Sequence, residues 1–259
     1  MTSTDRRTAL RTGAGLLAAG ALTAGCAPNG AGAHPTSSAH PSSTPSPTPS
    51  AAPGPRRYPG RPAQLTHGPR TRPRVALTFH GQGDPAFAHA LLTEAEKRGA
   101  RLTVLAVGSW LDQHPDMARR ILDGGHDLGN HTQRHLAVND MPEADARHEI
   151  TACADRLEQL TGSVGTWFRP SRAPLASPLV LRLARSAGYP HVLSYDVDSL
   201  DYTRPGADAV QRKVLDEVRG GSVVSMHFGY PDTVAALPVV LEELARRGLA
   251  AVTTTELFS

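Results

Sequence analysis

Short apolar runs alternate with longer amphipathic segments from about residue 74 to the end of the chain. A short apolar run between turn residues is typical of a buried strand, and apolar positions every three or four residues are typical of a helix. The predicted strands are 74–79, 101–107, 126–130, 166–169, 191–197, 222–227 and 250–257. The predicted helices are 85–98, 115–122, 142–160, 177–186, 207–218 and 233–247. Strands that alternate with helices in this way predict a parallel α/β fold.

Such a fold is either an open sheet or a barrel, and we expect an incomplete (β/α)7-type barrel of parallel strands. In both architectures the side chains that do chemistry gather at the carboxyl ends of the strands. The polar residues that follow the predicted strands are His80 and Asp84, His131 and His135, Arg169, Asp198 and Asp201, and His227. We expect these side chains to converge on one mouth of the fold.

Residues 1–26 have the pattern of an export signal. A basic start is followed by an uncharged stretch that is too short to span a bilayer, and then by small residues before Cys26. The segment LTAGC resembles a bacterial lipobox, which implies that Cys26 is acylated and anchors an exported protein to the membrane. An ordinary cleaved signal is the alternative, and the run DRRTALR also resembles a twin-arginine signal.

Residues 27–73 are rich in Pro, Ser, Ala, Gly and Thr and contain no acidic residue, so we expect a disordered linker. The folded domain is then 74–259. The formal charge of the chain is +3, and the six arginines of 27–74 together with a net +2 in 1–26 leave −5 for 75–259. A basic linker favours contact with an anionic envelope polymer or the membrane, and we expect no nucleic-acid partner and a monomer. A solvated linker without a partner is the alternative.

The two cysteines exclude a disulfide framework if Cys26 carries lipid. Cys153 lies at helical spacing from Ile150 and Leu157, which predicts a small buried core residue.

The segment HTQRH holds the clearest candidate metal ligands. Its histidines, His131 and His135, are four residues apart, and this spacing lets both imidazoles reach one cation from a helical turn or a tight loop. The spacing alone is weak evidence, but the pair directly follows the predicted strand 126–130.

Over about residues 74–259 the chain resembles the polysaccharide deacetylase family, the NodB-homology domain. The family carries the blocks TFDDG, H(S/T)xxH, RxP, D(S/T)xDW and an apolar residue followed by His. The matching stretches here are TFHGQGD, HTQRH, FRPS, DSLDY and SMHF, in the same order.

The resemblance implies metal-dependent hydrolysis of N- or O-acetyl groups on an acetylated envelope or extracellular polysaccharide. His131 and His135 would bind a divalent metal, usually zinc, with cobalt or nickel as alternatives. Arg169 would orient the base, and His227 would be the general acid, held by Asp201. Two more residues would contact the substrate: Tyr202, which replaces the family's Trp, and Pro170.

The first block departs from the family, because His80 and Gly81 stand where the family has two aspartates. Two replacements are open: His80 becomes a third metal ligand, and Asp84 becomes a ligand or the base. Asp84 lies just before Pro85, so capping of the next helix is the alternative for this residue. A lipid-anchored glycan-binding protein that has lost catalysis is therefore a second candidate function, and hydrolysis of another amide is a third.

Overall fold

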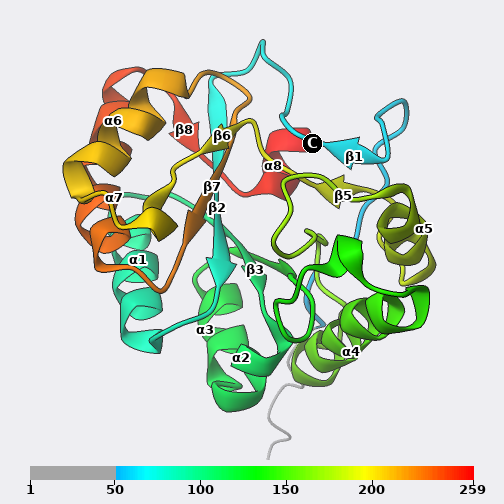
Figure 1. Cartoon of the computed structure of the whole chain (residues 1–259). Coiled ribbons are helices and arrows are strands. Elements are labelled where there is room, and N and C mark those ends of the chain that lie inside the picture. The colour runs from blue at the N-terminus through cyan, green and yellow to red at the C-terminus, as the bar shows by residue number, and fades with distance from the viewer. Residues whose placement is uncertain (1–50) are drawn as a thin grey trace, which may run out of the picture. The chain divides into compact units, whose positions relative to one another are not determined.

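The structure is a computed structural model that describes residues 51–259, and the predicted export signal and residues 27–50 of the predicted linker lie outside the described residues. The strands are β1 Gln64–Leu65, β2 Arg74–Gly81, β3 Thr103–Ala106, β4 Asp127–Asn130, β5 Val192–Leu193, β6 Val197–Asp198, β7 Val223–His227 and β8 Ala250–Ala251 (Figure 1). The α-helices are α1 Pro85–Lys97, α2 Gly108–Gln113, α3 Asp116–Asp123, α4 Glu143–Thr161, α5 Pro178–Ser186, α6 Ala207–Glu217, α7 Pro231–Arg246 and α8 Thr254–Phe258.

The strands form a parallel sheet that curls into an incomplete barrel. The order is β4-β3-β2-β7-β6, β8 pairs with β2, and β1 pairs with β5. Phe168 connects the two groups of strands, because it forms parallel bridges with Asn130 of β4 and Val192 of β5. The parallel α/β fold predicted from the alternation of strands and helices is confirmed.

Three predicted strands differ from the structure. The predicted strand 191–197 is interrupted and forms β5 and β6. The other two differ for local reasons. The predicted strand 166–169 is reduced to bridges at Phe168, because Pro170 follows and has no N–H to donate to a ladder. The predicted strand 250–257 ends at Ala251 and becomes α8 from Thr254. Thr253 and Glu256 form a capping box there, in which each side chain accepts from the other residue's backbone N–H, and this favours a helix.

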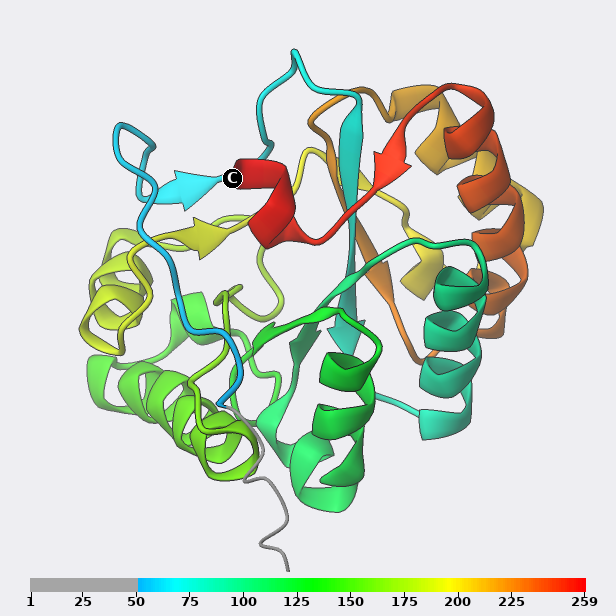
Figure 2. The ribbon, with the colours of Figure 1, turned by 180° about the vertical axis from the view of Figure 1, so that it is seen from behind.

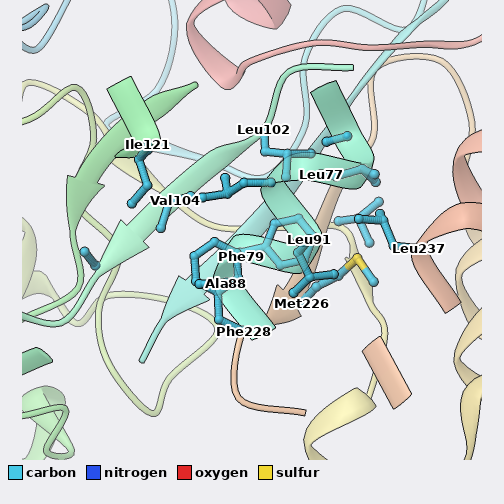
Figure 3. Packing of buried hydrophobic residues seen from close by; sticks show 14 of the residues in the cluster. Leu77, Phe79, Ala88, Leu91, Leu102, Val104, Ile121, Met226, Phe228 and Leu237 are labelled. Atoms are coloured by element: carbon cyan, nitrogen blue, oxygen red, sulfur yellow. The ribbon is translucent and has the colours of Figure 1, made fainter. Parts of the chain in front are cut away.

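The central strand β2 is buried on both faces, and its two faces have different roles. Leu77 and Phe79 point toward the helices and pack with Leu91 of α1, Met226 of β7 and Leu237 of α7 (Figure 3). Because successive side chains of a strand alternate, Thr78 and His80 point to the barrel interior. The helical side of β2 therefore packs into an apolar core, and the interior side holds Thr78 and His80 next to a second apolar cluster that includes Ala76 and Trp167.

Residues 51–73 do not form the disordered linker that we predicted. This segment runs along the body of the domain, where β1 pairs with β5 (Figure 2). Tyr58 stacks on Trp167 with ring centroids 5.6 Å apart, and Arg70 forms a 2.7 Å ion pair with Asp196. The few apolar and aromatic side chains in a Pro-rich sequence were enough to attach it, so the predicted boundary at Arg74 is wrong.

Two smaller points concern membrane-spanning helices and Cys153. Among the helices of residues 51–259, none is both long enough and apolar enough to cross a bilayer. Cys153 is fully buried and carries a free thiol, which confirms its predicted place in the core.

Candidate metal centre and catalytic site

The carboxyl ends of β2, β4 and β7 bring the predicted histidines together. His80 lies opposite His227 in the parallel register of β2 and β7. His131 directly follows β4, and its backbone N–H donates to the Ala106 carbonyl at the end of β3. The rule that polar groups gather at the carboxyl ends of parallel strands thus holds for this cluster.

His80, His131 and His135 form a group in which one ring nitrogen from each lies within 4.8 Å of the other two. The ring centroids of His80 and His131 are 4.1 Å apart, and those of His131 and His135 are 4.9 Å apart. His135 reaches this position from a left-handed backbone conformation with φ 56°, which is uncommon for a residue with a side chain. The tight loop after β4 therefore turns both histidines of HTQRH toward His80.

His131 presents a nitrogen that has no partner. Its Nδ1 lies 3.0 Å from the Arg169 carbonyl oxygen. Because a carbonyl only accepts, Nδ1 carries the proton, and the lone pair is on Nε2. Nε2 is buried without a hydrogen bond among the described residues. An imidazole that is fixed by a backbone carbonyl and has a bare second nitrogen is typical of a metal ligand.

His80, in contrast, uses both ring nitrogens. Arg169 Nη1 donates to His80 Nε2 across 3.2 Å, so the His80 proton is on Nδ1 and is donated to His227 Nε2 across 2.8 Å. A metal bound by His80 would replace one of these two hydrogen bonds. Replacement of the His227 bond would free His227 Nε2 for the substrate.

Asp201 holds His227 from the other side. Its carboxylate accepts from His227 Nδ1 at 2.6 Å, from the His227 backbone N–H at 2.8 Å and from the Thr233 hydroxyl at 2.6 Å. Asp201 is fully buried. A buried carboxylate with three donors fixes the orientation of the imidazole and stabilises its protonated form.

Arg169 is a fully buried cation without a carboxylate partner among residues 51–259. Besides His80, it donates to Thr78 Oγ1 at 2.9 Å and to the carbonyls of Leu193 and Ser194 at 3.2 and 3.0 Å. Burial lowers the pKa of its guanidinium to about 10. The residue that it contacts at the site is the imidazole at position 80, where the family has a carboxylate.

Burial is the main reason that the three clustered imidazoles are neutral. It holds the pKa of His80 and of His131 well below 6.5, and neighbouring imidazoles lower both values further. For His135, burial and then the Arg172 guanidinium lower the pKa to about 4. Neutral imidazoles keep the lone pairs that metal binding requires.

A pocket of about 350 Å³ opens beside this cluster. The predicted residues His80, His135, His227, Tyr202 and Pro170 line it, and the ring centroids of Tyr202 and His227 are 5.3 Å apart. Other lining residues were not among the predicted site residues: Gln82, Arg172, Tyr195, Ser225 and Tyr230. Of these, Gln82 lies in TFHGQGD and Ser225 in SMHF. A search of the residues around each predicted strand end would have found some of them.

Asp84 does not line this pocket. Its carboxylate accepts from the Ala86 N–H at 2.8 Å and caps α1, and the side chain is exposed. The chain between Gly81 and Asp84 is packed against its neighbours, because a Cβ on Gly83 would lie 2.7 Å from Gly229 Cα. The structure therefore brings His80 to the site and leaves Asp84 at the helix cap.

The residues present fit a divalent metal such as zinc. Three neutral imidazoles form a nitrogen donor set that zinc prefers, and three protein ligands leave a position for water or substrate. The buried bare nitrogen of His131 is the specific sign of a missing partner.

Comparison with known proteins points in the same direction. The family profile described as "Polysaccharide deacetylase" matches residues 67–192. A peptidoglycan-N-acetylglucosamine deacetylase of Bacillus cereus is 29% identical over 193 residues, which cover 73% of this chain and 90% of that protein. A chitooligosaccharide deacetylase of Sinorhizobium fredii is 29% identical and covers 68% of this chain and 87% of its own length.

The fold has solved counterparts. The crystal structure of BA3943 from Bacillus anthracis, described as a CE4 family pseudoenzyme, superposes with a TM-score of 0.72 at 23% identity and covers 77% of this chain and 70% of that chain. At this identity the likeness shows the fold alone. The matching profile, the two deacetylase relatives and the five sequence blocks show that this chain belongs to the polysaccharide deacetylase family.

Proposed function

We propose that this protein is a metal-dependent hydrolase that removes acetyl groups from an envelope or extracellular polysaccharide. The single observation that carries the proposal is the cluster of His80, His131 and His135 next to the His227–Asp201 pair. The relatives named as deacetylases of peptidoglycan and of chitooligosaccharide support an N-acetylated glycan as the substrate.

His80, His131 and His135 would hold the metal through three ring nitrogens, and we propose zinc as the ion. When bound, such an ion polarises the acyl carbonyl and lowers the pKa of a coordinated water. The pocket lined by Tyr202 and Pro170 would hold the sugar and direct its acetamido group toward the cluster.

His227 is the residue that would move the proton. With His80 turned onto the metal, His227 Nε2 is free to take a proton from the attacking water and to give it to the nitrogen as the C–N bond breaks. Asp201 stabilises the imidazolium in between. Arg169, which contacts His80, would act by orienting this side chain. We expected Asp84 to be a ligand or the base, but its capping position gives no support to either role.

The test is release of acetate by the full chain with zinc, cobalt or nickel. Acetylated chitooligosaccharide, peptidoglycan fragments and acetylated xylan are the substrates to compare. We expect His227→Ala to lower kcat by about 100-fold or more, because a positioned general acid or base contributes roughly 100- to 10,000-fold. If no substrate releases acetate with any of these metals, the proposed activity is wrong.

The second candidate is a catalytically impaired glycan-binding protein on the same scaffold. The observation that favours it is the His80–Gly81 pair in place of two aspartates, and a relative of similar fold is described as a pseudoenzyme. Glycan binding without acetate release would support this candidate. Metal held by His131 and His135 alone in a zinc-soaked crystal would also favour it.

We also propose export and acylation of Cys26. The lipobox-like LTAGC supports this part of the proposal. In a bacterial host, a labelled fatty acid should be incorporated into the wild-type chain and not into Cys26→Ser. Equal labelling of both chains would exclude this anchor.

A further inference from the structure

One hydroxyl in the wall of the pocket has no partner. Ser225 is 1% exposed, and its Oγ is buried without a hydrogen bond among the described residues. The same residue lines the pocket together with His80 and His227. Buried hydroxyls are nearly always hydrogen-bonded, because an unmade bond destabilises the folded state. An unpaired hydroxyl in a binding pocket therefore indicates a partner that arrives with a ligand.

The position of Ser225 relates it to the reacting groups. It lies two residues before His227 in β7, so both side chains are on the same face of the strand. In the parallel register Ser225 lies opposite Thr78 of β2 and Asp198 of β6. The Thr78 hydroxyl is already used, because it donates to the Val224 carbonyl and accepts from Arg169. Of these two hydroxyls, only that of Ser225 has no partner. It lies next to His227, which would protonate the leaving nitrogen.

The pocket wall on this side is polar. Besides Ser225 it includes Asp198 of β6 and Tyr195, whereas the apolar lining residues Pro170, Ala173 and Pro174 all come from the segment after Arg169. A methyl group placed against Ser225 would leave the hydroxyl unpaired. An acyl group that carries its own hydroxyl would satisfy it.

We propose that Ser225 recognises the acyl group of the substrate, and that the preferred substrate carries a hydroxyacyl amide of the glycolyl type rather than an acetyl amide. This inference rests on the proposed function and names its substrate class. In the reaction the water oxygen bonds to the acyl carbon and the C–N bond breaks. The sugar nitrogen leaves as the amine with the proton from His227, and glycolate is released.

The experiment compares two matched oligosaccharides of glucosamine, one N-acetylated and one N-glycolylated, with the full zinc-loaded chain. Release of acetate and of glycolate gives kcat/KM for each. We expect the wild type to prefer the glycolyl substrate by about tenfold, as for a site that hydrogen-bonds a substrate hydroxyl. Ser225→Ala should lose this preference.

A pair of variants with the same shape isolates the hydroxyl. Ser225→Thr keeps a hydroxyl and Ser225→Val replaces it by a methyl group, so any steric effect of the branched side chain is common to both. The Thr variant should retain the preference for glycolyl, and the Val variant should lose it. Equal kcat/KM for both substrates in the wild type, with no change of the ratio in Ser225→Ala, would overturn the inference and assign the hydroxyl to an ordered water.

If neither acid is released, the proposed hydrolysis fails and binding decides the inference. Saturation-transfer NMR with the same two oligosaccharides should then show tighter binding of the glycolyl form to the wild type than to Ser225→Ala. Equal binding of both forms to the wild type would contradict a role of Ser225 in recognising the acyl group.

Discussion

At the scale of single residues, the imidazoles of His80, His131 and His135 lie together beside the pocket. His80 and His131 are buried, and the Arg169 guanidinium contacts His80. Burial disfavours the charged form of each imidazole and is the main reason that all three pKa values are lowered. Nearby guanidinium groups lower them further, Arg169 for His80 and His131 and Arg172 for His135. The cost of burying them as neutral groups is offset when their lone pairs bind a metal.

These pKa values determine how the metal-free protein responds to pH. In the unfolded chain a histidine titrates near 6.5, and in the folded chain these values are lower, so between about pH 6.5 and 4 the unfolded state binds more protons. The free energy of unfolding should therefore fall as the pH falls through 6.5. For His135, whose pKa is about 4, the loss is at most roughly 3 kcal/mol by pH 4.

Urea unfolding of chelator-treated protein at pH 7, 5.5 and 4.5 measures this loss. His135→Gln should reduce the difference between pH 7 and pH 4.5, because one buried titrating group is gone. The control is His89→Gln, since His89 is exposed on α1 and should leave the difference unchanged. An identical pH dependence for His135→Gln and the wild type would contradict the explanation.

At the scale of elements, the pairing of β2 with β3 leaves no room for a side chain at Gly81. A Cβ there would lie 2.9 Å from Val104 Cγ1 and 3.1 Å from Ala106 Cα. β2 and β3 therefore pack closely enough to accept only glycine at position 81, where the family has its second aspartate. The missing aspartate cannot be restored at this position without movement of the backbone.

We expect Gly81→Ala to lower the free energy of unfolding by about 1–3 kcal/mol, as for other additions to a packed core. Gly81→Asp should cost more, because it also buries a carboxyl group. Gly54→Ala is the control, since a Cβ there meets only Ser163 Oγ at 3.6 Å. Thermal and urea unfolding measure these effects, and a neutral Gly81→Ala would show that β3 can move aside.

The segment before β2 is a second element with its own prediction. The Tyr58 ring stacks on Trp167 and contacts Phe258, with a centroid distance of 5.7 Å to the latter. We expect Tyr58→Ala to destabilise the protein by about 2 kcal/mol through lost aromatic packing. Tyr58→Phe should be nearly neutral, because the hydroxyl makes only a 3.5 Å contact with the Thr255 carbonyl.

Unfolding followed by tryptophan fluorescence reports on this contact directly, since Trp167 lies under Tyr58. Equal stability of Tyr58→Ala and the wild type would mean that the Tyr58 stacking adds nothing to the fold. The segment would then be held by the β1–β5 pairing and the Arg70–Asp196 ion pair.

At the scale of the whole molecule, metal binding should add to the stability of the fold. The ligands come from β2 and from the loop after β4, so one ion would connect two separate parts of the barrel. A metal at 100 times its dissociation constant stabilises the folded state by about 2.7 kcal/mol if it does not bind the unfolded chain.

We therefore expect zinc to raise Tm and a chelator to lower it again. His131→Ala and His80→Ala should each remove most of the shift, whereas His89→Ala should keep it. Retention of the full shift in His80→Ala would assign the metal to His131 and His135 alone. Calorimetric scans of the full chain with and without zinc measure these shifts.

Much of the architecture could be predicted from the sequence, because strands and helices have different apolar periods and are separated by turn and capping residues that act locally. The predictions were wrong where a local signal competed with the period. Pro170 shortened the fourth predicted strand, and the capping box at Thr253 turned the last one into a helix. The start of the domain was also wrong, because Tyr58 and Leu65 are too few to give a pattern and are covered only by partners distant in the sequence.

The candidate site, too, could be predicted only in part from the sequence. The sequence by itself determined the family, the strand ends at which the histidines lie, and the departure at His80 and Gly81, because motifs and periodicity are properties of neighbouring residues. Only the tertiary structure decided that His80 joins His131 and His135, that Asp84 caps a helix, and that Ser225 has a free hydroxyl in the pocket. Burial and hydrogen-bond partners depend on residues far apart in the chain, and strand register alone brings these residues together.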